Sequence, residues 1–214
     1  MPQAPMTKKR KAMVDRQLVA RGIHDARVLA AMSEVPREEF VPPELRNSAY
    51  LDCALPIDEH QTISQPYIVA HMLELAEIGP EAVVLEVGAG SGYAAAVLGR
   101  LARRVIAVER IEALAEMAAR RIAALGYGNV EIIHSDGCHG WPAAAPYDAI
   151  VVSAGGSDVP PALKEQLKVG GRLVIPLDRG ADQFLTRILR TTSDTFVEEL
   201  YEPVAFVPLI ADEA

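Results

Sequence analysis

The spacing of hydrophobic residues predicts that strands and helices alternate through the middle of the chain. Short apolar runs such as Ala82-Val-Val-Leu-Glu-Val87 are typical of strands buried on both faces of a sheet. Stretches with helical spacing separate these runs, and such alternation favours a parallel sheet with helices on both faces. We expect strands at residues 82–87, 104–108, 130–134, 149–152 and 172–175, and helices at residues 94–101, 111–125 and 161–167.

The two ends of the chain carry different patterns. Apolar residues from Val14 to Ile23 recur at helical spacing, and a proline-broken, loop-rich stretch follows at residues 49–66. Residues 184–190 and 196–206 have the pattern of strands, and their short connection favours an antiparallel pair. The sequence therefore predicts an α/β fold: a doubly wound, mostly parallel sheet with an N-terminal helical cap and a C-terminal antiparallel strand pair.

Length and composition fit a single domain. The chain has 214 residues, of which 50% are hydrophobic and 23% are charged. We expect a disordered tail at residues 1–12 and one domain at residues 13–214. Its parts are an N-terminal helical and loop region at residues 13–78, a βα core at residues 79–176 and C-terminal strands at residues 177–214.

Charge and hydropathy disfavour several classes of protein. The net charge of -8 and the pI near 5.2 disfavour nucleic-acid binding, because an acidic surface repels phosphate. No apolar run is long enough to span a bilayer, and no apolar segment follows the basic residues 8–11 as it would in a signal peptide. Cys53 and Cys138 read as reduced thiols. These features predict a cytoplasmic protein that binds neither nucleic acid nor membrane.

The strongest motif is Glu86-Val-Gly88-Ala-Gly90-Ser-Gly92-Tyr93, which lies between a predicted strand and a predicted helix. Glycines at such a turn let the chain bend tightly and let a ligand approach the backbone. Dinucleotide-binding folds use G-x-G-x-x-G, whereas the spacing here is G-x-G-x-G, which resembles S-adenosylmethionine-dependent methyltransferases. The alternative is a plain strand-to-helix turn.

Two acidic residues at the ends of later strands support a nucleoside ligand. Glu109 ends the second predicted strand, where a carboxylate can accept hydrogen bonds from both ribose hydroxyls. The alternative is an ion pair with Arg110. Asp136 follows the third strand and could accept a hydrogen bond from the adenine amino group, although Asp136-Gly137 is also a common turn dipeptide.

Beyond the glycine loop, nearly the whole chain resembles the protein-L-isoaspartate O-methyltransferase family. The Gln61-Thr-Ile-Ser-Gln-Pro66 segment is distinctive, and the family's active-site serine falls on Ser64. The other matching segments are Val35-Pro-Arg-Glu-Glu-Phe-Val-Pro42, Ala49-Tyr50, Leu55-Pro-Ile57, Val108-Glu-Arg-Ile111, His134-Ser-Asp-Gly137, Gly140-Trp-Pro142, Gly170-Gly-Arg-Leu-Val174 and Phe206-Val-Pro-Leu209.

The resemblance implies a Rossmann-like methyltransferase that begins the repair of damaged proteins. A methyl group would pass from S-adenosyl-L-methionine to the free carboxylate of an L-isoaspartyl residue, leaving S-adenosyl-L-homocysteine. The ester then cyclises to a succinimide, which water opens partly to normal aspartate. The substrates would be isoaspartyl-containing proteins and peptides, and we expect the enzyme to be a monomer.

The resemblance also assigns roles to residues of this chain. Ser64 is expected to orient the substrate carboxylate, and its alternative role is an N-cap of the following helix. Residues expected to bind the substrate are Thr62, Ile63, Ser64 and Val207. Residues expected to bind the cofactor are Glu86, Gly88, Ala89, Gly90, Gly92, Glu109, Arg110, Asp136, Gly137 and Ser153.

The sequence departs from the family at two places. Asp58-Glu59-His60 stands where the family usually has glycines, and Gly155-Gly156 falls in a turn that is usually rich in alanine. The first departure would favour a different carboxyl or small-molecule O-methyltransferase on the same fold. The Gln61–Pro66 segment disfavours a non-catalytic S-adenosylmethionine-binding or nucleotide-binding protein, and the glycine spacing disfavours a dehydrogenase. The five histidines lack metal-ligand spacing, so we predict no metal site.

Overall fold

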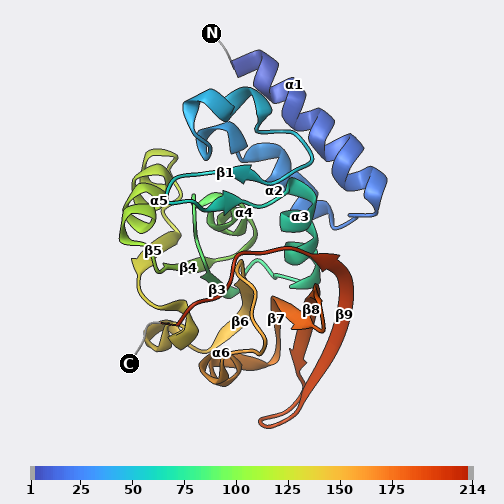
Figure 1. The fold of residues 1–214 in the computed structure, drawn as a ribbon, viewed down its shortest axis with the longest axis vertical. Coiled ribbons are helices and arrows are strands. Elements are labelled where there is room, and N and C mark those ends of the chain that lie inside the picture. Colours follow the sequence, from blue (N-terminus) through green and yellow to red (C-terminus); the bar gives the residue numbers. More distant parts are fainter. Residues whose placement is uncertain (1–2, 212–214) are drawn as a thin grey trace.

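A seven-stranded sheet forms the centre of the computed structural model, which describes residues 3–211 (Figure 1). Five parallel strands lie in the order β5-β4-β3-β6-β7, and β8 and β9 extend the sheet as antiparallel strands. The predicted mostly parallel sheet with a C-terminal antiparallel pair is therefore confirmed. The strand bounds are β3 Val83–Val87, β4 Arg104–Glu109, β5 Val130–His134, β6 Tyr147–Val152, β7 Leu167–Arg179, β8 Asp182–Arg190 and β9 Phe196–Val204.

Helices cover both faces of this sheet (Figure 1). Successive side chains of a strand face opposite sides, so Val84 joins the hydrophobic cluster under the N-terminal helices, whereas Leu85 joins the cluster that contains Leu163 of α6. This double burial explains why the central strands read as apolar runs. The helix bounds are α1 Gln3–Met13, α2 Ala26–Glu34, α3 Pro66–Leu75, α4 Tyr93–Leu101, α5 Glu112–Ala124 and α6 Pro161–Gln166.

The basic N-terminal segment is helical, so the prediction of a disordered tail at residues 1–12 is wrong for the part that the structure describes. Helix α1 begins at Gln3. The Arg10 guanidinium donates to the carbonyl oxygen of Glu34 at 2.6 Å and to the hydroxyl of Tyr50 at 2.9 Å. These contacts hold the helix against the rest of the N-terminal cap. They could not be predicted from the cluster of basic residues in this segment.

The predicted loop-rich stretch at residues 49–66 contains a short hairpin that the sequence pattern did not reveal. Strands β1 (Leu55–Pro56) and β2 (Thr62–Ile63) pair antiparallel. Strands of two residues are too short to show an alternating pattern, so their pairing depends on the surrounding structure.

The turn between β1 and β2 has an unusual backbone. The Gln61 N–H donates to the carbonyl oxygen of Asp58 at 3.2 Å, and the two residues between them have positive φ angles, 56° at Glu59 and 55° at His60. Two consecutive residues with positive φ describe a type I′ hairpin turn, which favours Asn-Gly or Gly-Gly. The Asp58-Glu59-His60 departure therefore places side chains where the backbone favours glycine.

After β9 the chain turns back across the carboxyl edge of the sheet, and we call residues 205–210 the C-terminal strap (Figure 1). The strap is joined to the loop after β6 by two backbone hydrogen bonds. The Gly155 N–H donates to the carbonyl oxygen of Val207 at 2.8 Å, and the Leu209 N–H donates to the carbonyl oxygen of Gly155 at 2.6 Å. These bonds bring the end of the chain to the carboxyl ends of β3 and β6.

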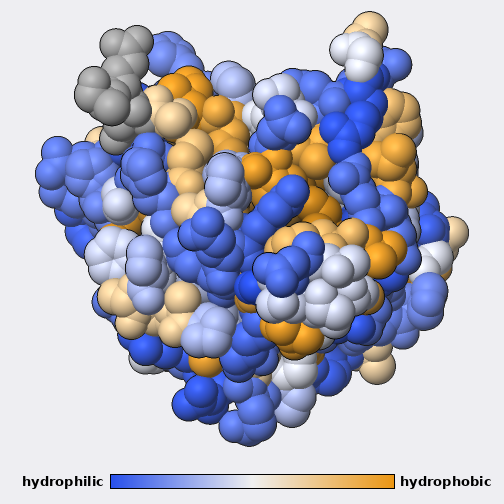
Figure 2. All heavy atoms as spheres, turned by 90° about the horizontal axis from the view of Figure 1, so that it is seen from below, coloured by the Kyte–Doolittle hydropathy of each residue, from blue (hydrophilic) through white to orange (hydrophobic). Residues whose placement is uncertain are grey.

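Seen from below, the surface shows hydrophobic patches between hydrophilic residues (Figure 2). Large exposed hydrophobic residues include Val169, Val197 and Leu200 on the β7–β9 side of the sheet. No helix within the described part of the chain has the length and apolar character needed to cross a membrane.

Candidate active site

The sheet reverses its strand order at β3, where β4 lies on one side and β6 on the other. Open α/β sheets bind ligands at such a point, outside the carboxyl ends of the strands. Gly88 follows β3 here and Ser153 follows β6. The two loops lie close together, since a Cβ on Gly88 would be 3.6 Å from Ser153. They form the floor of the candidate site.

The glycine loop adopts a conformation that requires its glycines. Gly88 and Gly92 both have φ at 87°, in the region that residues with a side chain rarely enter. The Gly88 N–H donates to the carbonyl oxygen of Val108 at 2.8 Å, which ties the loop to the end of β4. Helix α4 then begins at Tyr93, so the loop joins strand and helix as the motif predicts.

Glu109 at the end of β4 holds the glycine loop in place. One carboxylate oxygen accepts the N–H of Gly90 at 2.8 Å, and the other accepts the N–H of Ile111 at 2.9 Å. The residue is only 7% exposed, but it lines the cleft beside the loop. The ion pair with Arg110 that the sequence left open is not needed to explain the position of Glu109.

The cleft beside the glycine loop has a volume of about 370 Å³. The hairpin turn closes one side of it, and the C-terminal strap closes another. Its lining residues are His60, Gln61, Thr62, Val87, Gly88, Gly90, Val108, Glu109, Arg110, Ile111, Gly137, Ser153, Ala154, Val207, Pro208, Leu209 and Ile210. Adjacent apolar and carboxylate surfaces suit a nucleoside with ribose hydroxyls.

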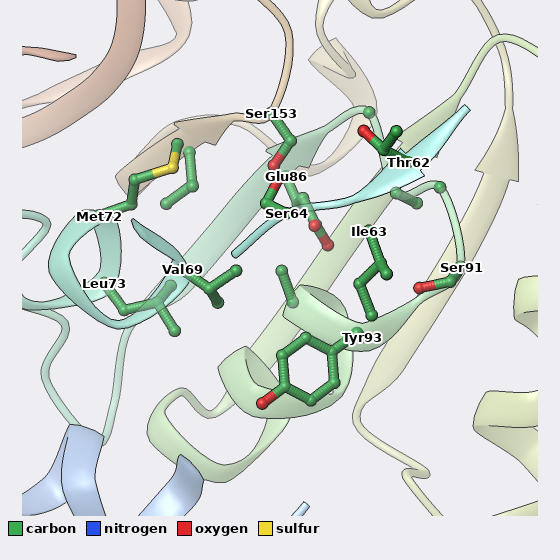
Figure 3. Close-up of a pocket in the computed structure, with 15 residues that line it drawn as sticks. Thr62, Ile63, Ser64, Val69, Met72, Leu73, Glu86, Ser91, Tyr93 and Ser153 are labelled. Carbon is green, nitrogen blue, oxygen red and sulfur yellow. The ribbon is translucent and has the colours of Figure 1, made fainter. Parts of the chain in front are cut away.

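Glu86 is the most unusual ionisable group of the site. Its side chain is fully buried, and neither carboxylate oxygen has a hydrogen-bond partner among the described residues. Burial, and secondarily the charge of Glu109, raise the pKa of Glu86 well above its usual value. Figure 3 shows Glu86, Ser64 and Ser153 gathered around one small cavity, while the Tyr93 hydroxyl points away from them. A donor that entered this cavity would find an unused acceptor.

A second groove, of about 440 Å³, lies on the other side of Thr62. Thr62, Ser153 and Val207 line both this groove and the cleft, so they form a shared wall. The remaining lining residues of the groove are Ala54, Ser64, Gln65, Ile68, Pro203, Val204, Ala205 and Phe206. Two ligands bound in the cleft and the groove would therefore meet at this wall.

Ser64 lies where the groove and the small cavity of Glu86 meet, because it lines both. It directly follows β2, and the hairpin carries it to the carboxyl edge of the sheet. The alternative interpretation of Ser64 as an N-cap is wrong, since Gln65 occupies that position and Pro66 is the first helical residue. The capping role thus does not account for Ser64.

The structure brings most of the predicted site residues together. Those that line the cleft, the groove or the small cavity are Thr62, Ile63, Ser64, Glu86, Gly88, Ala89, Gly90, Glu109, Arg110, Gly137, Ser153 and Val207. Gly92 is instead the N-cap of α4, and Asp136 uses its carboxylate to accept the N–H of Cys138 at 2.8 Å. Neither of these two residues lines the three cavities, although both lie beside residues that do.

Sequence reasoning missed several lining residues. His60 and Ile111 line the cleft, and Ile68 and Phe206 line the groove. Ile111 and Phe206 lie within segments that match the family, and His60 directly precedes the Gln61–Pro66 segment, so the sequence did carry a signal for these three residues. Within residues 3–211, no group of three or more His, Cys, Asp and Glu side chains could hold a metal ion.

A doubly wound sheet with a G-x-G-x-G loop at its switch point and an acidic residue after the second parallel strand defines a Rossmann-like methyltransferase. The sequence profile described as protein-L-isoaspartate(D-aspartate) O-methyltransferase matches residues 8–214. The chain belongs to this family.

Individual relatives agree with the family match. The chain is 57% identical to a protein-L-isoaspartate O-methyltransferase of Rhodopseudomonas palustris over 94% of this chain and 93% of that one. It is 53% identical to a protein-L-isoaspartate O-methyltransferase of Synechococcus, over 96% of this chain and 87% of that one.

Two solved structures share the fold. A protein-L-isoaspartate O-methyltransferase has a TM-score of 0.84 at 30% identity, over 93% of this chain and 65% of that one. A Plasmodium falciparum protein described in the same way, solved with S-adenosyl-L-homocysteine, has a TM-score of 0.82 at 26% identity, over 94% and 98%.

Proposed function

We propose that this protein transfers a methyl group from S-adenosyl-L-methionine to the free carboxylate of L-isoaspartyl residues in damaged proteins and peptides. The observation that carries the proposal is the shared wall of Thr62, Ser153 and Val207 between a nucleoside-sized cleft and an open groove. Ser64 stands beside that wall. Family membership and relatives at 57% and 53% identity support the same reaction.

The residues present fit S-adenosylmethionine, which when bound supplies an electrophilic methyl group on a sulfonium. The glycine loop leaves backbone free of side chains at the cleft, and Glu109 would accept from the ribose hydroxyls. Glu86 offers an acceptor without a partner. Arg110, Gly137 and Ser153 complete the proposed binding site, and Gly92 and Asp136 would support it from behind.

The substrate needs positioning rather than proton transfer. A carboxylate has a pKa of about 4, so at neutral pH it is already the nucleophile and no general base is required. The chain must align it and exclude water, which can contribute on the order of 7–11 kcal/mol. We assign the Ser64 hydroxyl as a donor to the carboxylate and Thr62, Ile63 and Val207 as groove residues.

A small-molecule O-methyltransferase fits the structure less well. The groove is bordered by exposed residues such as Ala54, Pro203 and Ala205, so a polypeptide could enter and leave it. The Asp58–His60 departure, which favoured this alternative, lies at the hairpin turn, and His60 lines the cleft rather than the groove. The proposal extends to a monomer acting in the cytoplasm, where the two free cysteines would stay reduced.

The test is transfer of labelled methyl to matched isoaspartyl and aspartyl peptides. We expect labelling of the isoaspartyl peptide only, and cofactor binding without labelling of either peptide would refute the proposal. Ser64→Ala should lower turnover on the order of tenfold or more while cofactor affinity stays the same, because one donor to the carboxylate is lost. Ser33→Ala, on the exposed face of α2, is the matched control.

The ribose assignment has its own test. Glu109→Gln keeps the size of the side chain but removes its charge, and it replaces one of the two oxygens that accept the N–H groups of Gly90 and Ile111. We expect the dissociation constant for S-adenosyl-L-homocysteine to rise severalfold by calorimetry, because charge-assisted hydrogen bonds are stronger than neutral ones. An unchanged constant would remove Glu109 from the binding site.

A further inference from the structure

Arg37 is a buried cation directly behind Ser64. It opens the 3₁₀ turn Arg37–Glu39 after Pro36, and its side chain has no exposed surface. Its guanidinium donates through Nη2 to the carbonyl oxygen of Ser64 at 2.9 Å and through Nε to the carbonyl oxygen of Ala49 at 2.7 Å. It also stands 4.8 Å from the ring centre of Tyr93, the residue that starts α4 after the glycine loop.

No carboxylate among the described residues balances this charge. Nη1 has no hydrogen-bond partner among the described residues, and the ionisable groups that act most strongly on the guanidinium are Tyr93, Tyr50 and Cys53, none of which is a carboxylate. Burial lowers the pKa of Arg37, but an arginine stays protonated at neutral pH. A buried charge without a counter-charge is costly, and removing the partner of a buried pair is strongly destabilising. Among the described residues, therefore, no carboxylate forms an ion pair with this cation.

The proposed substrate would bring such a carboxylate. We propose that Arg37 is the buried counter-charge for the isoaspartyl carboxylate, acting across the Ser64 backbone that it holds in place. This inference rests on the proposed function. Arg37 does not touch the groove, so it is a positioning residue whose positive potential reaches a carboxylate bound at the Ser64 hydroxyl.

The change of charge during the reaction gives the inference a distinct consequence. Methyl transfer forms a bond between a carboxylate oxygen and carbon and breaks the bond between sulfur and carbon, so the anionic substrate becomes a neutral ester. A fixed cation therefore attracts the substrate more strongly than the product. Because the negative charge already fades in the transition state, Arg37 should act on the KM for the peptide more than on kcat.

The experiment compares Arg37→Gln and Arg37→Lys with the wild-type protein. We expect KM for the isoaspartyl peptide to rise on the order of tenfold in R37Q and less in R37K, with kcat changed less than KM. Arg27→Gln is the control for the loss of an arginine that bridges two backbone carbonyls: Arg27 is more exposed than Arg37, and it donates to the carbonyls of Ile78 and Leu101, which do not line the groove. It should lower stability without raising KM.

A neutral ligand separates electrostatics from a structural role. The isoaspartyl peptide and its α-carboxamide analogue differ in the charge that Arg37 would attract. R37Q should lose affinity for the charged peptide and bind the carboxamide as the wild type does. An equal loss of affinity for both ligands, or an unchanged KM for the isoaspartyl peptide in folded R37Q, would overturn the inference.

A measurement on the wild-type protein keeps the test valid if R37Q does not fold. The ¹⁵N resonance of Arg37 Nε, assigned by comparison with R37K, should shift on titration with the isoaspartyl peptide and not with the carboxamide. No difference between the two titrations would refute the role of Arg37. The proposed function itself would be refuted by a different result, in which the wild-type protein methylates neither the isoaspartyl nor the aspartyl peptide.

Discussion

Gly155→Ala tests whether the C-terminal strap is held in place by one side chain. A Cβ at this position would lie 2.0 Å from Nε2 of Gln183, so the two cannot coexist unless the glutamine moves. Oε1 of Gln183 accepts the N–H of Phe206 at 2.7 Å, which fixes the start of the strap. The glycine that departs from the family pattern therefore makes room for a glutamine that anchors the strap.

The expected magnitude follows from the bond that is lost. A neutral hydrogen bond contributes about 1 kcal/mol net. If the variant must re-form the strap to bind its cofactor, that loss corresponds to about a fivefold rise in the dissociation constant. The strap residues Val207, Pro208, Leu209 and Ile210 line the cleft, so its displacement should be felt there. Calorimetry with S-adenosyl-L-homocysteine measures the effect.

A control variant and a double-mutant cycle test whether Gln183 holds the strap. Gly156→Ala is the matched control, because a Cβ there would meet nothing closer than 3.6 Å, and we expect wild-type affinity. In a double-mutant cycle, Gly155→Ala should add little to Gln183→Ala, because both remove the same anchor. Additive effects, or equal affinities for the two alanine variants of the glycine pair, would show that Gln183 does not hold the strap.

Two further predictions concern stability. Glu59→Gly and His60→Gly should each stabilise the protein by roughly 0.5–1 kcal/mol, because glycine adopts positive φ without the cost of about 1–2 kcal/mol that a side chain imposes. Thermal unfolding measures this change. As a control, Asp58→Gly, which lies in the same turn without a positive φ, should destabilise the protein. The raised pKa of Glu86 means that the folded protein keeps a proton that the unfolded chain releases above pH of about 4.5. The free energy of unfolding of the cofactor-free protein should therefore fall as pH rises from about 4.5 toward the raised pKa of Glu86. Urea unfolding of Glu86→Gln should lack this part of the decline. A stability difference between Glu86→Gln and the wild-type protein that does not vary with pH would contradict the prediction.

The hydrophobic pattern predicted the central sheet because the burial of its strands and the burial of its covering helices both leave a local pattern in the sequence. Strands buried on both faces must be apolar throughout, as in β3 and β4, and helices covering them must have one apolar side. The glycine loop was predictable for a similar reason, since a positive φ at Gly88 and Gly92 restricts the residue type directly. Strand β7 is longer than predicted, because its pairing with β8 extends it to Arg179 and the pairing of Leu167 with Tyr147 of β6 begins it before the apolar run.

The N-terminal segment and the hairpin were missed because their order comes from distant contacts. Residues 3–13 are basic and look solvated, but Arg10 meets Tyr50, which lies 40 positions away. The turn at Glu59 and His60 contradicts local preference, so only the packing of the surrounding chain keeps it in a type I′ conformation.

The sequence alone determined the alternation of strands and helices in the central sheet, the cofactor loop and the family resemblance, because each is carried by short segments of the chain. Only the tertiary structure decided that Ser64, Ser153 and Val207 surround one groove, that Arg37 lies behind Ser64 without a counter-charge, and that Gln183 fills the space beside Gly155. Contacts of this kind join residues whose separation along the chain is large. Their energies depend on burial and distance, which a linear pattern of residue types does not contain.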